Sequence, residues 1–136
     1  SQGGAFCYAA AALSYPEYTF TAIAPNVAFL GDYPDYFRIV SWPGDTAKAN
    51  KGSMTDEEMY AFLSYYDTKN LATRISAAVL ASSGLQDGTC PPHTNFAPFN
   101  NLSNPDKEMV IDPTMGHSFP AGWTTKYEKF FQERTK

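Results

Sequence analysis

The chain has 136 residues, of which 43% are hydrophobic and 15% aromatic, and it carries a formal net charge of −4 at pH 7. That length is enough for one domain with a buried core. The negative charge argues against a nucleic-acid partner, and no apolar run approaches the length of a membrane span.

The two cysteines, Cys7 and Cys90, fit neither a CxxC motif nor a zinc-binding spacing. We therefore expect two free, packed thiols. A disulfide between them stays open at this stage. The compartment stays open with it: cytoplasmic, or secreted or periplasmic in a bacterium.

Along the first part of the chain, helix-like and strand-like segments alternate. The Ala-rich stretch after Gly3 predicts a buried helix, and the β-branched and aromatic stretch before Pro25 predicts a strand. In chain order we expect a helix over 3–13, a strand over 18–24, an aromatic loop region over 29–42 with a short helix near 36–40, and a polar surface loop over 43–53.

The second part of the chain carries clearer helix signals. Thr55 and Glu58 have the spacing of a capping box, and Asp67 is placed to cap a following helix. We expect helices over 56–66, 68–74 and 93–102, strands over 77–83 and 108–112, and an amphipathic helix over 123–134 with Tyr127, Phe130 and Phe131 on one face.

Strands separated by helices predict a parallel sheet, and hence the α/β class. Three strands are few for such a sheet, because both faces need cover and the edges need protection. We therefore expect the second half of a larger, mostly parallel sheet flanked by helices. Residues 1–136 would form one partial domain, with its other strands before Ser1.

Three reactive side chains fall in loops beyond the carboxyl ends of predicted strands. Ser1, followed by the pair Gly3-Gly4, has the pattern of the downstream half of a G-x-S-x-G nucleophile elbow. Asp87 follows the second predicted strand, and His117 follows the third. Serine needs an imidazole to take its proton, and the imidazole needs a carboxylate to hold its tautomer. The order Ser, Asp, His is that of α/β-hydrolases, so we expect the C-terminal half of an α/β-hydrolase fold.

Each of these residues has an ordinary structural explanation when taken alone. Ser1 followed by glycines can simply be the point where this sequence begins. An Asp before Gly is often a turn residue, and a lone His is often a surface or capping group. Together and in this order, Ser1, Asp87 and His117 favour a catalytic triad. Asp32 is the second choice as the acid, and His93 ranks below His117 because it opens a helix, where the dipole disfavours imidazolium.

The residue after the nucleophile supplies one oxyanion-hole donor in this fold, which here is the backbone N–H of Gln2. The other donor comes from an early loop that this stretch lacks. Losing one donor costs about 2.7–4 kcal/mol, so we expect the chain alone to be a poor catalyst. On the substrate side, Phe29 and Tyr33 are candidates to line an acyl pocket or stack on a sugar, although most aromatic residues pack in cores.

Residues 1–4, 63–72, 84–92 and 116–117 together resemble the acetyl xylan esterase and cephalosporin C deacetylase family, carbohydrate esterase family seven. Its most specific part here is Leu-Gln-Asp followed by Cys-Pro-Pro within 84–92. No family feature stands in 41–55, and everything before the nucleophile is missing.

The resemblance implies Ser1 as nucleophile, Asp87 as acid, His117 as base and Gln2 as an oxyanion-hole donor. It also implies an α/β-hydrolase fold and hydrolysis of acetyl esters on short xylo-oligosaccharides, with no metal or other cofactor. Family members are often hexamers, so a homo-oligomer is open. Two alternatives remain: another α/β-hydrolase, such as a prolyl-oligopeptidase-type peptidase, and a non-catalytic interaction module.

Overall fold

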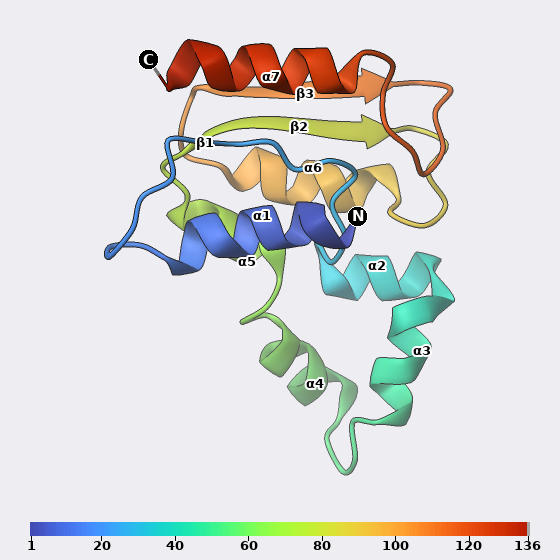
Figure 1. The fold of residues 1–136 in the computed structure, drawn as a ribbon. Helices are drawn as coiled ribbons and strands as arrows, with labels where there is room; N and C mark the ends of the chain where they lie inside the picture. The colour runs from blue at the N-terminus through green and yellow to red at the C-terminus, as the bar shows by residue number, and fades with distance from the viewer. Residues whose placement is uncertain (136) are drawn as a thin grey trace.

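The central element is strand β2 (Ala78–Gly84), which is buried along its whole length. In the computed structural model, which describes residues 1–135, β1 (Ala22–Ile23) and β3 (Lys107–Asp112) flank β2 in the order β1-β2-β3. Both pair with it in parallel (Figure 1). The expected parallel α/β sheet is therefore confirmed.

The first strand is shorter than the expected 18–24. Ala22 pairs with Ala78, the first residue of β2, so residues 18–21 have no strand beside them. After β1, only an isolated bridge between Asn26 and Ser82 continues the pairing. The composition of 18–24 suits a strand, but the point where its partner begins decides its length.

Helices cover both faces of the sheet (Figure 1). On one face α7 (Trp123–Arg134), with the bounds expected from the sequence, packs against the alternate β2 residues Ala78 and Leu80. On the other face lie α1 (Gln2–Leu13) and α6 (Pro92–Asn101), which share a core with Val79 and Ala81 of β2. The period of two along a strand thus gives the sheet one core on each face.

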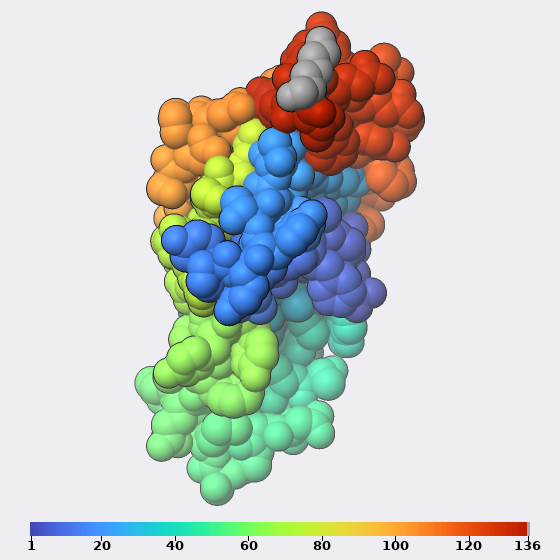
Figure 2. Space-filling view, turned by 60° about the vertical axis from the view of Figure 1, so that its left-hand side comes forward, coloured from blue at the N-terminus to red at the C-terminus, as the bar shows by residue number. Residues whose placement is uncertain are grey.

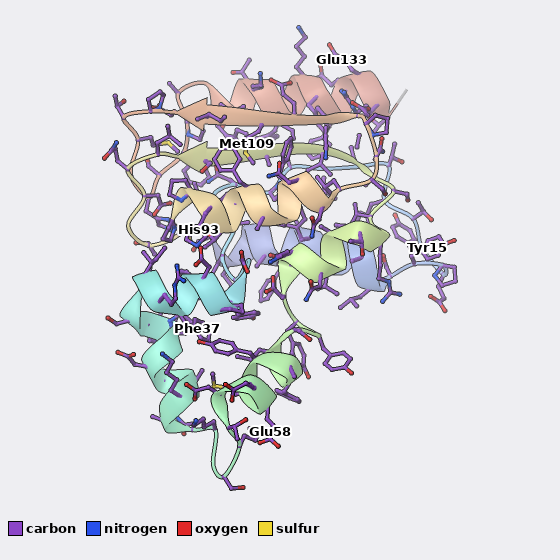
Figure 3. The ribbon with its side chains drawn as sticks, turned by 180° about the vertical axis from the view of Figure 1, so that it is seen from behind. Tyr15, Phe37, Glu58, His93, Met109 and Glu133 are labelled. Atoms are coloured by element: carbon purple, nitrogen blue, oxygen red, sulfur yellow. The ribbon has the colours of Figure 1, made fainter. Side chains whose placement is uncertain are left out.

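The helices α2 (Tyr33–Ile39), α3 (Ser41–Ala49) and α4 (Asp56–Leu63) form a group below the sheet in Figure 1. Their core is aromatic. Phe37 of α2 points toward α4 (Figure 3), and its ring centroid lies 6.0 Å from that of Tyr60. The expected surface loop over 43–53 was wrong for its first part, because α3 occupies it.

The position of α3 is explained by its contact with α2. Gly44 is buried, and a Cβ there would lie 2.8 Å from the Cβ of Phe37, so this turn lies directly on α2. The Ala47-Lys48-Ala49 run then continues with good helix formers. Trp42 has non-helical backbone angles and kinks α3, so Pro43 stands in the first turn of the main part of the helix, where proline is tolerated. The polar composition of the segment therefore did not exclude a helix.

The two predicted helix caps are confirmed. The Thr55 hydroxyl accepts the Glu58 N–H at 3.1 Å, and the Glu58 carboxylate accepts the Thr55 N–H at 2.8 Å. Asp67 caps α5 (Thr68–Leu71), which a 3₁₀ turn over Ala72–Arg74 extends. Helix α4 ends at Leu63, earlier than the expected 66, because turns replace its last residues, whereas α5 and its 3₁₀ extension together reach the expected Arg74.

Both cysteines are free thiols, as expected; Cys90 is buried and Cys7 half-buried. On the outside, the turn after α1 lies between α7 above and α4 below in the view of Figure 2. It exposes the side chains of Tyr15 and Tyr18. None of the helices formed by residues 1–135 is long and apolar enough to span a bilayer.

Candidate active site

Asp87 and His117 lie in the loops that follow β2 and β3, and their side chains are in contact. His117 Nδ1 lies 2.8 Å from Asp87 Oδ2. The other carboxylate oxygen accepts the backbone N–H groups of Thr89 and Cys90, each at 2.8 Å. The Asp87 side chain is fully buried, whereas 32% of the His117 side chain is exposed.

This hydrogen-bond pattern assigns the histidine tautomer. An ionised carboxylate only accepts hydrogen bonds, and Asp87 receives two from backbone donors on its far side. Nδ1 of His117 is then the third donor, which leaves Nε2 as an acceptor. An imidazole held in this way can take a proton from a hydroxyl.

The two loops are held together where β2 ends. A Cβ on Gly84 would lie 2.3 Å from the carbonyl oxygen of Met115, so only glycine fits this crossing. Two backbone hydrogen bonds join the loops beyond it, from Leu85 to Asp112 and from Gln86 to Met115. The contact between Asp87 and His117 therefore depends on backbone packing at adjacent strand ends.

Ser1 is the N-cap residue of α1, yet its hydroxyl caps no backbone N–H. Its carbonyl oxygen accepts the N–H groups of Ala5 and Phe29, both at 3.1 Å. Ser1 lines a cavity of about 380 Å³ together with Asn26 and Phe119, the latter two positions after His117. The structure thus brings Ser1 to a cavity that the His117 loop also lines; within residues 1–135 no hydrogen bond joins the two side chains.

Gln2 is exposed in the first turn of α1, directly after Ser1. The first N–H groups of a helix have no partner within the helix, and they carry the positive end of its dipole. The neighbouring Gly4 lies so close to the chain that a Cβ would be 2.8 Å from the Asn26 carbonyl oxygen. The N-terminus of α1 is therefore held tightly against the segment after β1.

That segment has unusual backbone angles, which the sequence did not reveal. Val27, Leu30 and Asp32 all have positive φ, at 38°, 63° and 56°. Such angles in non-glycine residues cost about 1–3 kcal/mol each and gather at functional sites. The buried Asp67 carboxylate holds the end of this segment by accepting the N–H groups of Asp32 at 2.9 Å and Tyr33 at 3.0 Å.

The two aromatic candidates have different surroundings. Tyr33 is only 5% exposed and packs edge-on against Phe37, so it belongs to the aromatic core under the sheet. Phe29 is half-buried, and its ring lies between Tyr36 and Trp42. Phe29, unlike Tyr33, donates its backbone N–H to the carbonyl oxygen of Ser1.

Asp32 and His93, the second choices as acid and base, form contacts away from Ser1, Asp87 and His117. Asp32 forms an ion pair with Lys69 at 2.9 Å. His93 begins α6 near α2 (Figure 3), where its Nε2 lies 3.4 Å from the Asp35 carboxylate. Asp112, which ends β3, has a structural role: it accepts the backbone N–H groups of Thr114 and Met115, and this lowers the pKa of its carboxyl group.

Asp87, Cys90 and His117 place potential ligand atoms within 4.8 Å of one another, the spacing of a metal site. A metal ligand thiol must lose its proton. Burial, and then the neighbouring Asp87, raise the pKa of Cys90 to about 12. Because the Asp87 oxygens also accept three hydrogen bonds already, the group fits a proton relay better than a metal site.

A parallel sheet whose successive strands end in such loops defines the chain as part of an α/β-hydrolase fold. The family model described as acetyl xylan esterase (AXE1) matches residues 1–134. The chain belongs to the acetyl xylan esterase family.

Three relatives are similar over almost the whole chain. The acetyl esterase Axe7A of Xylanibacter ruminicola is 32% identical over 134 residues, which are 97% of this chain and 28% of that protein. The structure of acetyl xylan esterase 1 from Thermoanaerobacterium sp. JW/SL YS485 superposes with a TM-score of 0.87 at 30% identity, covering 100% of this chain and 44% of that one. The acetyl xylan esterase from Paenibacillus sp. R4 gives 0.85 at 33% identity, covering 98% and 43%. The chain thus spans less than half the length of these relatives.

Proposed function

We propose that Ser1, His117 and Asp87 form the catalytic triad of a serine esterase, and that residues 1–136 are a partial α/β-hydrolase domain running from the nucleophile turn to the last helix. The reaction is removal of acetyl groups from xylo-oligosaccharides or related acetylated carbohydrates. The observation that carries this proposal is the 2.8 Å contact between His117 Nδ1 and the buried Asp87 carboxylate.

In the first half of the reaction, Ser1 Oγ attacks the acetyl carbonyl carbon and its proton passes to His117 Nε2. Asp87 holds the ring and stabilises the imidazolium. The tetrahedral oxyanion accepts a hydrogen bond from the Gln2 N–H. The C–O bond to the sugar then breaks, and the sugar alkoxide takes the proton from His117.

In the second half, His117 takes a proton from water, and the resulting hydroxide attacks the acetyl-Ser1 ester. Collapse of this second intermediate releases acetic acid and restores the serine hydroxyl. A second oxyanion donor comes from an early loop in this fold. We therefore expect turnover by residues 1–136 alone to be about 10²–10³-fold below that of a domain with both donors.

The choice of acetyl esters rests on the family to which the chain belongs. Its relatives are named acetyl esterase and acetyl xylan esterase. Comparing the hydrolysis of acetylated xylose with that of an aminoacyl anilide separates the esterase from a peptidase with the same order of triad residues.

The test is covalent labelling with a fluorophosphonate, followed by mapping of the modified peptide by mass spectrometry. We expect the label on Ser1, with loss of labelling in Ser1→Ala and His117→Gln. Ser53→Ala, at an exposed surface serine, is the matched control and should label normally. Labelling at another serine, or labelling that survives His117→Gln, would contradict the triad.

A further inference from the structure

Trp42, in the first turn of α3, exposes a large aromatic surface next to Phe29. Its side chain is 62% exposed. Its indole stacks on the Phe29 ring with centroids 5.5 Å apart and planes 17° from parallel. One face of Trp42 therefore lies on Phe29, and the other is available to a partner.

The stack is held in place from below. The Phe29 ring meets Tyr36 edge to face at 5.7 Å and 89°. Tyr36 is almost fully buried, and its hydroxyl donates to the Thr89 carbonyl oxygen at 2.9 Å. The turn that carries Trp42 lies on α2 through Gly44, where there is no room for a side chain. The indole plane is thus set before any ligand arrives.

The stack is linked to two parts of the candidate active site. Phe29 donates its backbone N–H to the Ser1 carbonyl oxygen at 3.1 Å. Through Tyr36 the stack reaches Thr89, whose own N–H donates to Asp87 at 2.8 Å. In Figure 1, α2 and α3 lie at the same end of the molecule as the N-terminus and the carboxyl ends of β2 and β3.

We propose that the outer face of Trp42 is a stacking platform for a pyranose ring of the carbohydrate substrate. The C–H groups on a sugar ring face are weakly polar and pack against an aromatic ring. A tryptophan that is already fixed loses little rotamer freedom on binding. The proposal rests on the proposed function for its choice of sugar, but it concerns binding and needs no reactive serine.

Xylobiose without acetyl groups is the probe, because it cannot enter the reaction. The chain has two tryptophans, and Trp123 lines the cavity that contains Ser1. The titration therefore uses Trp123→Phe, in which the indole fluorescence comes from Trp42. We expect a saturable change in intensity and a blue shift of the emission. A spectrum that xylobiose leaves unchanged would overturn the platform.

Variants then assign the site by calorimetry or by chemical shifts. Trp42→Ala should weaken xylobiose binding at least tenfold, whereas Trp42→Phe should weaken it only two- to threefold because it keeps a ring. Tyr65→Ala removes an aromatic side chain that is 78% exposed near α4 and is the matched control, with no change expected. Equal binding by Trp42→Ala and the unaltered chain would refute the proposal.

The catalytic triad and the Trp42 platform can be refuted independently of each other. Ser1→Ala should abolish labelling and leave xylobiose binding unchanged. In hydrolysis, Trp42→Ala should raise KM for acetylated xylobiose about tenfold, whereas Trp42→Phe, which keeps a ring at this position, should raise it only two- to threefold. An unchanged KM for acetylated xylobiose in Trp42→Ala would refute the Trp42 platform even if Ser1 proved to be the nucleophile.

Discussion

Asp87 Oδ2 and His117 Nδ1 lie 2.8 Å apart although the two residues are 30 positions apart in the chain. The contact arises because β2 and β3 are parallel neighbours, so their carboxyl ends carry their loops to one edge of the sheet. The same two strand ends exclude any side chain at Gly84. The relationship is thus a product of the sheet, and its chemical role can be tested directly.

Asp87→Asn should lower ester hydrolysis and fluorophosphonate labelling by about 10⁴-fold, because an amide can donate to Nδ1 and so favour the wrong imidazole tautomer. The amide oxygen can still accept the Thr89 and Cys90 N–H groups, so the free energy of unfolding should fall by only about 1 kcal/mol. Asp45→Asn, at an exposed position on α3, is the control. A loss of activity below tenfold would remove Asp87 from the triad.

Gly4→Ala should destabilise the chain by about 1–3 kcal/mol, because its methyl group would overlap the Asn26 carbonyl and Ala28. Gly3→Ala, one residue earlier in the same helix, meets no atom within 4 Å. It should stabilise the chain by about 0.5–1 kcal/mol through helix propensity. Urea unfolding of both variants measures the difference, and equal midpoints would show that α1 is not packed as described.

Asp67→Ala should reduce the free energy of unfolding by about 2–4 kcal/mol, since the N–H groups of Asp32, Tyr33 and Lys69 lose their charged acceptor. The positive-φ segment would also lose the contact that holds its end. Glu17→Ala, at an exposed turn position, should change stability by less than about 0.5 kcal/mol. Thermal or urea unfolding checks both, and a neutral Asp67→Ala would disprove the role of this carboxylate.

Cys90 should resist alkylation in the folded chain. With its pKa raised to about 12, only about one thiol in 10⁴ is ionised at pH 8, and the thiolate is the reactive form. Because the pKa is raised, labelling by iodoacetamide should grow tenfold per pH unit between pH 7 and 10. Burial also raises the pKa of the half-buried Cys7, which should nonetheless react faster than Cys90. Peptide mapping with and without denaturant measures both rates; equal Cys90 rates in the two conditions would contradict its burial.

The predictions that depended on short-range sequence signals were confirmed. The Thr55–Glu58 capping box, the Asp67 cap and the amphipathic helix over 123–134 were all predicted and are all present. Each depends on hydrogen bonds or on a spacing of side chains within a few residues. The helix over 41–49 escaped prediction because its position is decided by the contact of Gly44 with α2.

The sequence by itself determined the fold class and the family, and it named Asp87 and His117 as candidates from their order along the chain. Only the tertiary structure decided that these two side chains touch, that Tyr33 is buried in a core, and that Trp42 presents its ring to solvent. The physical reason is that residue type and spacing set local conformation, whereas burial and contact depend on segments far away in the chain that pack against each position.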